Sequence, residues 1–147
     1  MHGNIYDELG SNRVYIWRHA LSIVPNRPLL GTGPDAFFFA FPPAAHAKYG
    51  EFYDKAHNEY LQILVCQGIL GLTAYLAFLG SVIITGTKKA FSSPAAAAAL
   101  IAATGYLVQA FFNISHPIAS QILWVMFGLL TCRHIHTERK QEEQIKP

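Results

Sequence analysis

The chain has 147 residues, a formal net charge of +2 and 52% hydrophobic residues. No charged side chain occurs from Tyr60 to Thr87, and His116 is the only charged or basic residue between Ala90 and Cys132. This distribution excludes an ordinary soluble domain, because uncharged runs of roughly 20 apolar residues are long enough to cross a bilayer. The small net charge gives no indication of a nucleic-acid partner, and none is expected.

The first predicted element is a helix from Arg13 to Val24, with Ser11 or Asn12 as its N-cap and Pro25 at its end. Apolar residues recur along it at steps of three, four and three, at Val14, Trp17, Leu21 and Val24. Such a stripe predicts an amphipathic helix that rests on the membrane or on neighbouring helices.

The segment that follows is rich in proline, glycine and aromatic residues. Its proline and glycine content between Pro28 and Pro34 predicts turns. Gly31-Thr32-Gly33 is only superficially similar to a phosphate-binding loop, because no strand precedes it and Pro34 lacks an amide donor. The aromatic run from Phe37 to Phe41 is expected at a lipid interface.

His57-Asn58, followed nine residues later by Gly68-Ile69-Leu70-Gly71, is the most informative pattern in the chain. If Asn58 caps a long helix, Gly68 follows His57 by about three turns and lies beneath it on one face. Small residues dominate the contacts between membrane helices. Gly68 and Gly71 therefore predict the close approach of a second membrane helix.

Three membrane helices are expected near residues 59–85, 94–113 and 117–133, the second uncharged run being broken before Pro117. Basic residues mark the cytoplasmic side, and here they are Lys88, Lys89, Arg133, Arg139 and Lys140. The sequence thus predicts an all-α integral membrane protein. Its expected parts are an extracytoplasmic segment over 1–57, three membrane helices over 58–133 and a cytoplasmic tail over 134–147.

Residues 1–25 have neither the basic start nor the apolar core of a signal peptide. Three helices also enclose little core. We therefore expect the chain to be the C-terminal piece of a larger multi-pass protein, whose remainder is its partner. Cys66 and Cys132 fall in spans near opposite faces, so they are expected to pack as small apolar groups rather than form a disulfide.

His57 is the first candidate for chemistry. The positive end of the helix disfavours an imidazolium, so the ring should stay neutral and act as a general base toward a hydroxyl. The alternative is an interfacial histidine that hydrogen-bonds a loop carbonyl. Asp54 could orient the ring or be a solvated acid, and His116 could line the same cavity or merely hydrogen-bond its turn.

Arg13, Arg18 and Arg27 are the second set of candidates. Guanidinium groups grip phosphate with paired hydrogen bonds and stabilise negative charge that develops on a departing diphosphate. The alternative is that they are solvated, or that they snorkel from an interfacial helix. Three other histidines lack the carboxylate or cysteine neighbours of a convincing metal site, namely His46, His134 and His136. No metal and no cofactor are expected.

These patterns together resemble the C-terminal part of the O-antigen ligase and polysaccharide polymerase family. The family signature is His followed by Asn, Ser or Gln, then nine residues, then Gly-x-x-Gly, Thr or Tyr. His57-Asn58 and Gly68-Ile69-Leu70-Gly71 match it at the correct spacing. Upstream, Arg13-Val14-Tyr15-Ile16-Trp17 and Pro28-Leu29-Leu30-Gly31-Thr32-Gly33-Pro34 match two further family motifs. The resemblance covers roughly residues 11–80.

The resemblance implies a metal-independent GT-C glycosyltransferase in the bacterial inner membrane. Such enzymes move a glycan from undecaprenyl diphosphate to a hydroxyl of a lipid, glycan or protein, with inversion at the anomeric carbon. It implies that His57 activates the acceptor and that Arg13 contacts the diphosphate. We also expect Arg18, Arg27 and Asn58 to bind substrate. Family members have about ten or more membrane helices, so this piece alone is expected to be inactive.

Two other functions are compatible with the sequence. A non-catalytic membrane anchor or accessory subunit that binds polysaccharide or a partner protein would use the same aromatic residues and amphipathic helix. A small transporter fragment is disfavoured, because no charge lies inside the predicted spans to mark an ion path.

Overall fold

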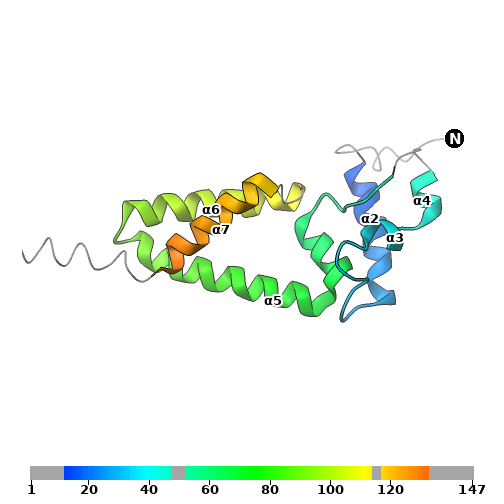
Figure 1. Cartoon of the computed structure of the whole chain (residues 1–147), viewed down its shortest axis with the longest axis horizontal. Coiled ribbons are helices and arrows are strands. Elements are labelled where there is room, and N and C mark those ends of the chain that lie inside the picture. Colours follow the sequence, from blue (N-terminus) through cyan, green and yellow to red (C-terminus); the bar gives the residue numbers. More distant parts are fainter. Residues whose placement is uncertain (1–11, 48–51, 114–116, 133–147) are drawn as a thin grey trace, which may run out of the picture. The chain divides into compact units, whose positions relative to one another are not determined.

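The computed structural model describes residues 12–47, 52–113 and 117–132 of the chain (Figure 1). Within those ranges every regular element is a helix. The elements are α2 (Arg13–Ile23), the 3-10 helix η1 (Val24–Asn26), α3 (Phe37–Ala40), α4 (Pro43–Ala47), α5 (Glu59–Ala90), α6 (Pro94–Phe112) and α7 (Pro117–Thr131). The predicted all-α class is therefore confirmed.

The chain divides into two compact units. The first combines Met1–Ala77 with Val108–Ser115, and the second combines Phe78–Leu107 with His116–Pro147. Helices α2, α3, α4 and the start of α5 belong to the first unit, which also holds His57, Asn58 and the three candidate arginines.

The most buried face of α2 differs from the apolar stripe found in the sequence. Its buried side chains are Tyr15, Ile16, Ala20 and Ile23. In the expected stripe, by contrast, Leu21 is 55% exposed, and the other three members are only partly buried. Both sets have helical spacing because α2 is apolar on more than one side, so periodicity alone does not identify the face that packs. The stripe is therefore not the most buried face of α2, although Trp17 and Val24 do pack against the core cluster.

The ends of α2 agree with the sequence better than its face does. Asn12 is the N-cap residue, but it has a left-handed backbone (φ 63) and its side chain makes no capping bond, so a side-chain cap from Asn12 was wrong. Ser11, the other candidate, lies outside the described residues. The α-helix ends at Ile23, and Pro25 falls in η1 because it lacks the N–H that an α-helix would use there.

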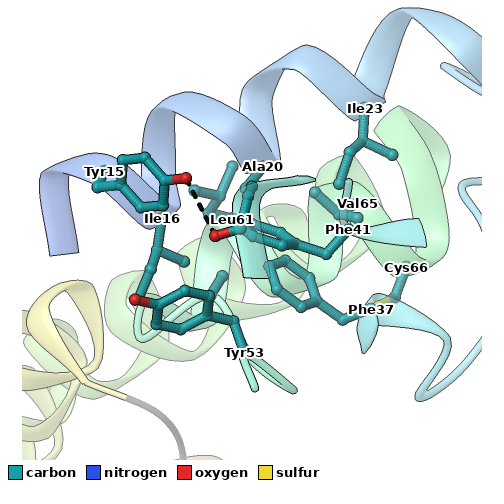
Figure 2. Packing of buried hydrophobic residues seen from close by; sticks show 12 residues of the cluster. Tyr15, Ile16, Ala20, Ile23, Phe37, Phe41, Tyr53, Leu61, Val65 and Cys66 are labelled. Carbon is teal, nitrogen blue, oxygen red and sulfur yellow. Dashed lines mark hydrogen bonds between the residues drawn. The ribbon is translucent and has the colours of Figure 1, made fainter. Parts of the chain in front are cut away.

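An aromatic cluster forms the core of the first unit, between α2 and the start of α5 (Figure 2). Phe37 and Phe41, one turn apart, are 0% and 1% exposed, and their rings stack at 5.4 Å. Tyr15 donates its hydroxyl hydrogen to the carbonyl of Ala45 at 3.0 Å. The expectation that this aromatic run lies at a lipid interface is therefore wrong for Phe37 and Phe41. Phe39, which points away from the cluster, is 86% exposed.

Helix α5 is not one straight span, because Gly68 has non-helical angles (φ 70, ψ −170) and separates a short first segment from a long second one. The second segment, Ile69 to Ala90, has 22 residues. At the α-helical rise it is about 33 Å long, which matches the roughly 30 Å hydrocarbon core of a bilayer. The sequence predicts Gly68 beneath His57 on one face of a continuous helix. That prediction is wrong, because the helix is interrupted at Gly68 itself.

The proline- and glycine-rich loop after η1 pairs with the backbone at this break. Four backbone–backbone hydrogen bonds join them: Thr32 N–H to Val65 O at 2.9 Å, Gly33 N–H to Cys66 O at 2.9 Å, Ile69 N–H to Pro28 O at 2.8 Å and Leu70 N–H to Leu29 O at 3.3 Å. An interrupted helix leaves carbonyls of one segment and amides of the next without helical partners. The loop supplies partners for both, so the break is stable although it is buried in the protein.

The close approach of the loop explains why glycine occupies both sides of the contact. A Cβ on Gly31 would lie 2.5 Å from the carbonyl carbon of Cys66, and one on Gly68 would lie 2.3 Å from the carbonyl oxygen of Leu29. Both glycines also have positive φ, 68 and 70. The predicted contact of Gly68 with a second membrane helix was wrong, because the loop takes that place. At Gly71 a Cβ would meet the Cβ of Gln67 at 2.4 Å.

Two helices, α5 and α6, are long and apolar enough to cross a membrane by length and composition. Helix α6 begins at Pro94 and ends at Phe112, one residue short of its predicted end. Helix α7 is apolar but has 15 residues, fewer than the roughly 20 of an untilted crossing. Of the three expected spans, two meet the length of a crossing in the described ranges, and the third is a shorter apolar helix.

Aromatic contacts and a polar contact near one end help to hold the second unit together. The ring of Phe78 lies 5.6 Å from that of Trp124 and 5.7 Å from that of Phe127. Lys89 donates a hydrogen bond from Nζ to the carbonyl oxygen of Cys132. The last turn of α5 and the end of α7 therefore meet. Cys132 is an exposed free thiol, contrary to its expected packing, because α7 ends one residue before it.

Candidate active site

The candidate site is the turn that precedes α5, with His57 at its tip. His57 has φ 50, which places a non-glycine residue in the left-handed region, and its side chain is half-buried. Histidine tolerates this region better than most residues, but the conformation persists only where its surroundings enforce it. The residues on either side of His57 supply that enforcement.

Asn58 fixes the downstream side of the turn. Its Oδ1 accepts the N–H of Leu61 at 3.0 Å, and its carbonyl accepts the N–H of Gln62 at 2.9 Å. The side chain is 5% exposed. Asn58 is thus the N-cap of α5, as predicted, and the positive end of the helix lies directly beside His57.

Ala56 fixes the upstream side. It is fully buried, and both of its backbone polar groups are bonded to side chains. Trp17 on α2 donates from Nε1 to the Ala56 carbonyl at 2.9 Å. Gln62 on α5 accepts the Ala56 N–H on its Oε1 at 2.8 Å. The two peptide groups that flank Ala56, just before His57, are therefore held by side chains of two helices.

The imidazole of His57 is biased toward its neutral form. Burial lowers the pKa of His57 below its ordinary value of 6.5, and the positive charge of Arg13 lowers it further. The carboxylate of Asp54 raises this pKa and Lys55 lowers it, both with smaller effects. The direction agrees with the sequence-based expectation, and burial is its main cause. A neutral ring at neutral pH can accept a proton.

The structure brings one of the three candidate arginines into the electrostatic environment of His57. Arg13, partly buried at the start of α2, is among the charges that act on the ring. Arg18 and Arg27 have exposed side chains and, among the charges of the described residues, neither contributes to the pKa shift of His57. Asp54 is exposed yet close enough to act on the ring, whereas His116 lies outside the described residues.

Comparison with known proteins identifies the family to which this part of the chain is related. Residues 4–76, which contain α2, the loop, the His57 turn and the break at Gly68, match the family model described as O-antigen ligase. This region belongs to the O-antigen ligase family. No curated protein and no solved structure matches the chain.

Membership in the O-antigen ligase family has consequences at the family level. For this region the match supports a membrane protein of the O-antigen ligase or polymerase type and, at the family level, a glycosyltransferase-like enzyme. The two helices with the length and composition of a membrane crossing agree with this assignment. The matched region ends at residue 76, so the family assignment rests on the first unit and on the beginning of the crossing segment.

An apolar groove in the first unit lies next to the His57 turn. Its volume is about 280 Å³, and its lining includes Trp17, Leu64, Leu72 and Phe111. Asn58, the residue after His57, also lines the groove. The Trp17 and Phe111 rings meet edge to face at 5.7 Å and form part of its wall. An apolar cavity beside a neutral imidazole suits a substrate with a lipid part.

Sequence reasoning missed Glu59, the first residue of α5. Its Oε1 accepts the hydroxyl hydrogen of Tyr75 at 2.9 Å, which ties the two segments of α5 together across the break. Its Oε2 is buried and has no hydrogen-bond partner among the described residues. The available signal was an acid at the very start of an uncharged run, which is an expensive place for a carboxylate unless a donor reaches it.

The remaining candidates make no metal centre in the described part of the chain. His46 accepts the N–H of Tyr53 on Nδ1 at 3.1 Å, and its ring lies 5.0 Å from that of Phe41. It is therefore a packing residue. In the same ranges, no group of three or more His, Cys, Asp or Glu residues is arranged to hold a metal ion. His134 and His136 lie outside them.

Proposed function

We propose that the chain acts in glycan transfer from undecaprenyl diphosphate to an acceptor hydroxyl, with His57 as the base and Arg13 on the diphosphate. The observation that carries the proposal is the half-buried His57, whose pKa is lowered by burial and by the charge of Arg13. Because Arg13 is close enough to act electrostatically on His57, the pair suits a reaction that removes a proton from the acceptor and releases a diphosphate with one additional negative charge.

In the proposed reaction the acceptor hydroxyl gives its proton to the neutral imidazole of His57. The acceptor oxygen forms a bond to the anomeric carbon while the bond from that carbon to the diphosphate oxygen breaks. The electron pair of the broken bond leaves with undecaprenyl diphosphate, whose growing negative charge Arg13 stabilises through paired hydrogen bonds. Attack opposite the leaving group inverts the anomeric carbon. Arg18, Arg27 and the buried cap Asn58 are proposed to contact substrate.

We further propose that the protein is a multi-pass protein of the bacterial cytoplasmic membrane, with residues 1–57 on the outer side and 134–147 in the cytoplasm. The hydrogen bond between Lys89 and Cys132 supports this path, because it joins the end of α5 to the end of α7. Both ends carry the basic residues that mark the cytoplasmic side. His57 then lies at the outer surface, where carrier-linked glycans are used.

Substitution of His57 by alanine tests the proposed function. In the complete protein, expressed in cells that lack the wild-type copy, we expect His57→Ala to insert and accumulate normally but to transfer glycan at least about a hundredfold more slowly, the usual contribution of a general base. Incorporation of labelled glycan into the acceptor measures the rate.

The matched control is His134→Ala, which removes a histidine from the proposed cytoplasmic tail and should leave transfer unchanged. Normal transfer by His57→Ala would disprove the assigned base. It would also favour the alternative, a non-catalytic anchor or accessory subunit.

A further inference from the structure

We propose that Trp17 and Gln62 are positioning residues, which hold the two peptide groups that flank Ala56 so that the imidazole of His57 faces Arg13 in the geometry that glycan transfer requires. This inference rests on the proposed function. It assigns a role to two side chains that are distant from each other in sequence and that the reaction itself does not use.

The argument begins at Ala56, which is fully buried. A buried backbone N–H or C=O without a partner costs roughly 1–3 kcal/mol, so such groups are nearly always paired. Here helical neighbours do not provide the partners. The Nε1 of Trp17 reaches the carbonyl at 2.9 Å and the Oε1 of Gln62 reaches the N–H at 2.8 Å.

The hydrogen bonds to Ala56 matter because the next residue, His57, has a strained backbone conformation. A residue at φ 50 is held there by the groups on either side of it. Downstream, the Asn58 cap bonds to Leu61 and Gln62. Upstream, Trp17 and Gln62 bond to Ala56. Gln62 therefore takes part on both sides, through its backbone N–H and its side chain.

Trp17 also connects the turn to Arg13. The two residues are four apart on α2, so their side chains project from the same face, one above the other. The hydrogen bond from Trp17 to Ala56 thus fixes how far the turn stands from the helix that carries Arg13. This gives a physical reason for the spacing Arg13-x-x-x-Trp17: one residue acts on the imidazole and the other sets its position.

The charges that act on His57 come from α2 and from its own turn. They are Arg13 on α2, and Asp54 and Lys55 on the turn. None is changed when Trp17 or Gln62 is replaced by a neutral residue. A change in the titration of His57 in such variants therefore reports a change in its position or burial.

The experiment compares Trp17→Phe and Gln62→Met with the unmodified protein in the membrane. Phenylalanine keeps an aromatic ring but lacks the indole N–H, and methionine keeps the length of glutamine but lacks its acceptor. We expect the pKa of His57, followed by NMR of labelled histidine, to rise toward 6.5 as the ring moves from its buried place beside Arg13. We expect kcat for glycan transfer to fall about tenfold or more while KM changes little, since misplacement of a catalytic group acts on the reaction step.

Matched controls and a rescue separate positioning from general damage. Trp124→Phe and Gln67→Met make the same chemical changes at exposed sites that take no part in the Ala56 hydrogen bonds, and should leave both readouts unchanged. Gln62→Glu keeps an acceptor oxygen and should restore most of the kcat lost in Gln62→Met. If Trp17→Phe fails to accumulate, benzothienylalanine at position 17 replaces it, because this residue keeps the bicyclic ring and lacks only the N–H.

The outcomes distinguish this inference from the proposed function. An unchanged His57 titration and unchanged kcat in both Trp17→Phe and Gln62→Met would overturn the positioning role, while the loss of transfer in His57→Ala would still stand. A shifted titration with a lowered kcat supports the role. If His57→Ala itself transfers normally, the proposed function fails, and the positioning role fails with it.

Discussion

At the scale of single residues, the protonation state of His57 depends on the groups that surround it. The sequence predicts a neutral ring from the position of His57 before a capped helix, and the structure agrees in direction. It adds two causes that no local pattern contains, namely burial and the charge of Arg13. Arg13 is 44 residues away in the chain, so the fold alone determines that it acts on His57.

The burial of His57 and the charge of Arg13 predict how the rate of glycan transfer depends on pH. The folded pKa of His57 is depressed, so the basic form predominates above the ordinary value of 6.5 and is lost as pH falls through the lowered pKa. We expect the acid limb of the rate profile to lie below 6.5. Arg13→Gln should move this limb to higher pH and Asp54→Asn to lower pH, measured as glycan transfer between about pH 5 and 8.

Arg13→Lys is the matched control for this experiment. It keeps the positive charge and should leave the limb where it is. It should still lower kcat/KM, because lysine cannot form the paired hydrogen bonds of a guanidinium and one lost charged bond is worth about 1.5–3 kcal/mol. A limb that stays in place when Arg13 becomes glutamine would show that this charge does not act on the base.

At the scale of elements, two glycine motifs that look independent in the sequence form one contact. The sequence correctly predicts a turn around Gly31 and a special role for Gly68. It does not predict that the two meet, since the four hydrogen bonds join backbone groups more than thirty residues apart and leave no periodic pattern. Helix periodicity instead extrapolates α5 through Gly68 and assigns the small residue there to a helix–helix interface.

Substitution of these glycines should destabilise the first unit. Gly68→Ala or Gly31→Ala forces a Cβ to within 2.3 or 2.5 Å of backbone atoms at a positive φ. We expect a loss of more than about 2 kcal/mol in the free energy of unfolding, from left-handed strain and overpacking together. Thermal unfolding of the purified protein in detergent measures the change.

Gly80→Ala is the control for this prediction, because a Cβ at Gly80, in the helical second segment of α5, meets nothing within 4 Å. Alanine is the better helix former, so this variant should be neutral or slightly more stable. Equal stability of Gly68→Ala and Gly80→Ala would contradict the account of the break.

At the scale of the whole molecule, the sequence predicts which segments are apolar helices better than it predicts how helices pack. The ends of α6 and α7 fall within two residues of their expected positions, because charge-free runs and flanking prolines mark them directly. The face that α2 buries and the burial of Phe37 and Phe41 were missed. In an apolar chain many residues are suited to either lipid or protein, and composition does not distinguish the two environments.

The central claim is that His57 and Arg13 serve one reaction centre at the outer membrane surface. A structure of the complete protein with an undecaprenyl-diphosphate-linked glycan bound tests it most directly. We predict diphosphate oxygens within about 2.7–3.2 Å of the Arg13 guanidinium nitrogens, and the His57 imidazole on the opposite side of the anomeric carbon with room for one hydroxyl between them. A diphosphate held away from Arg13, or an imidazole turned away from the sugar, would contradict the account.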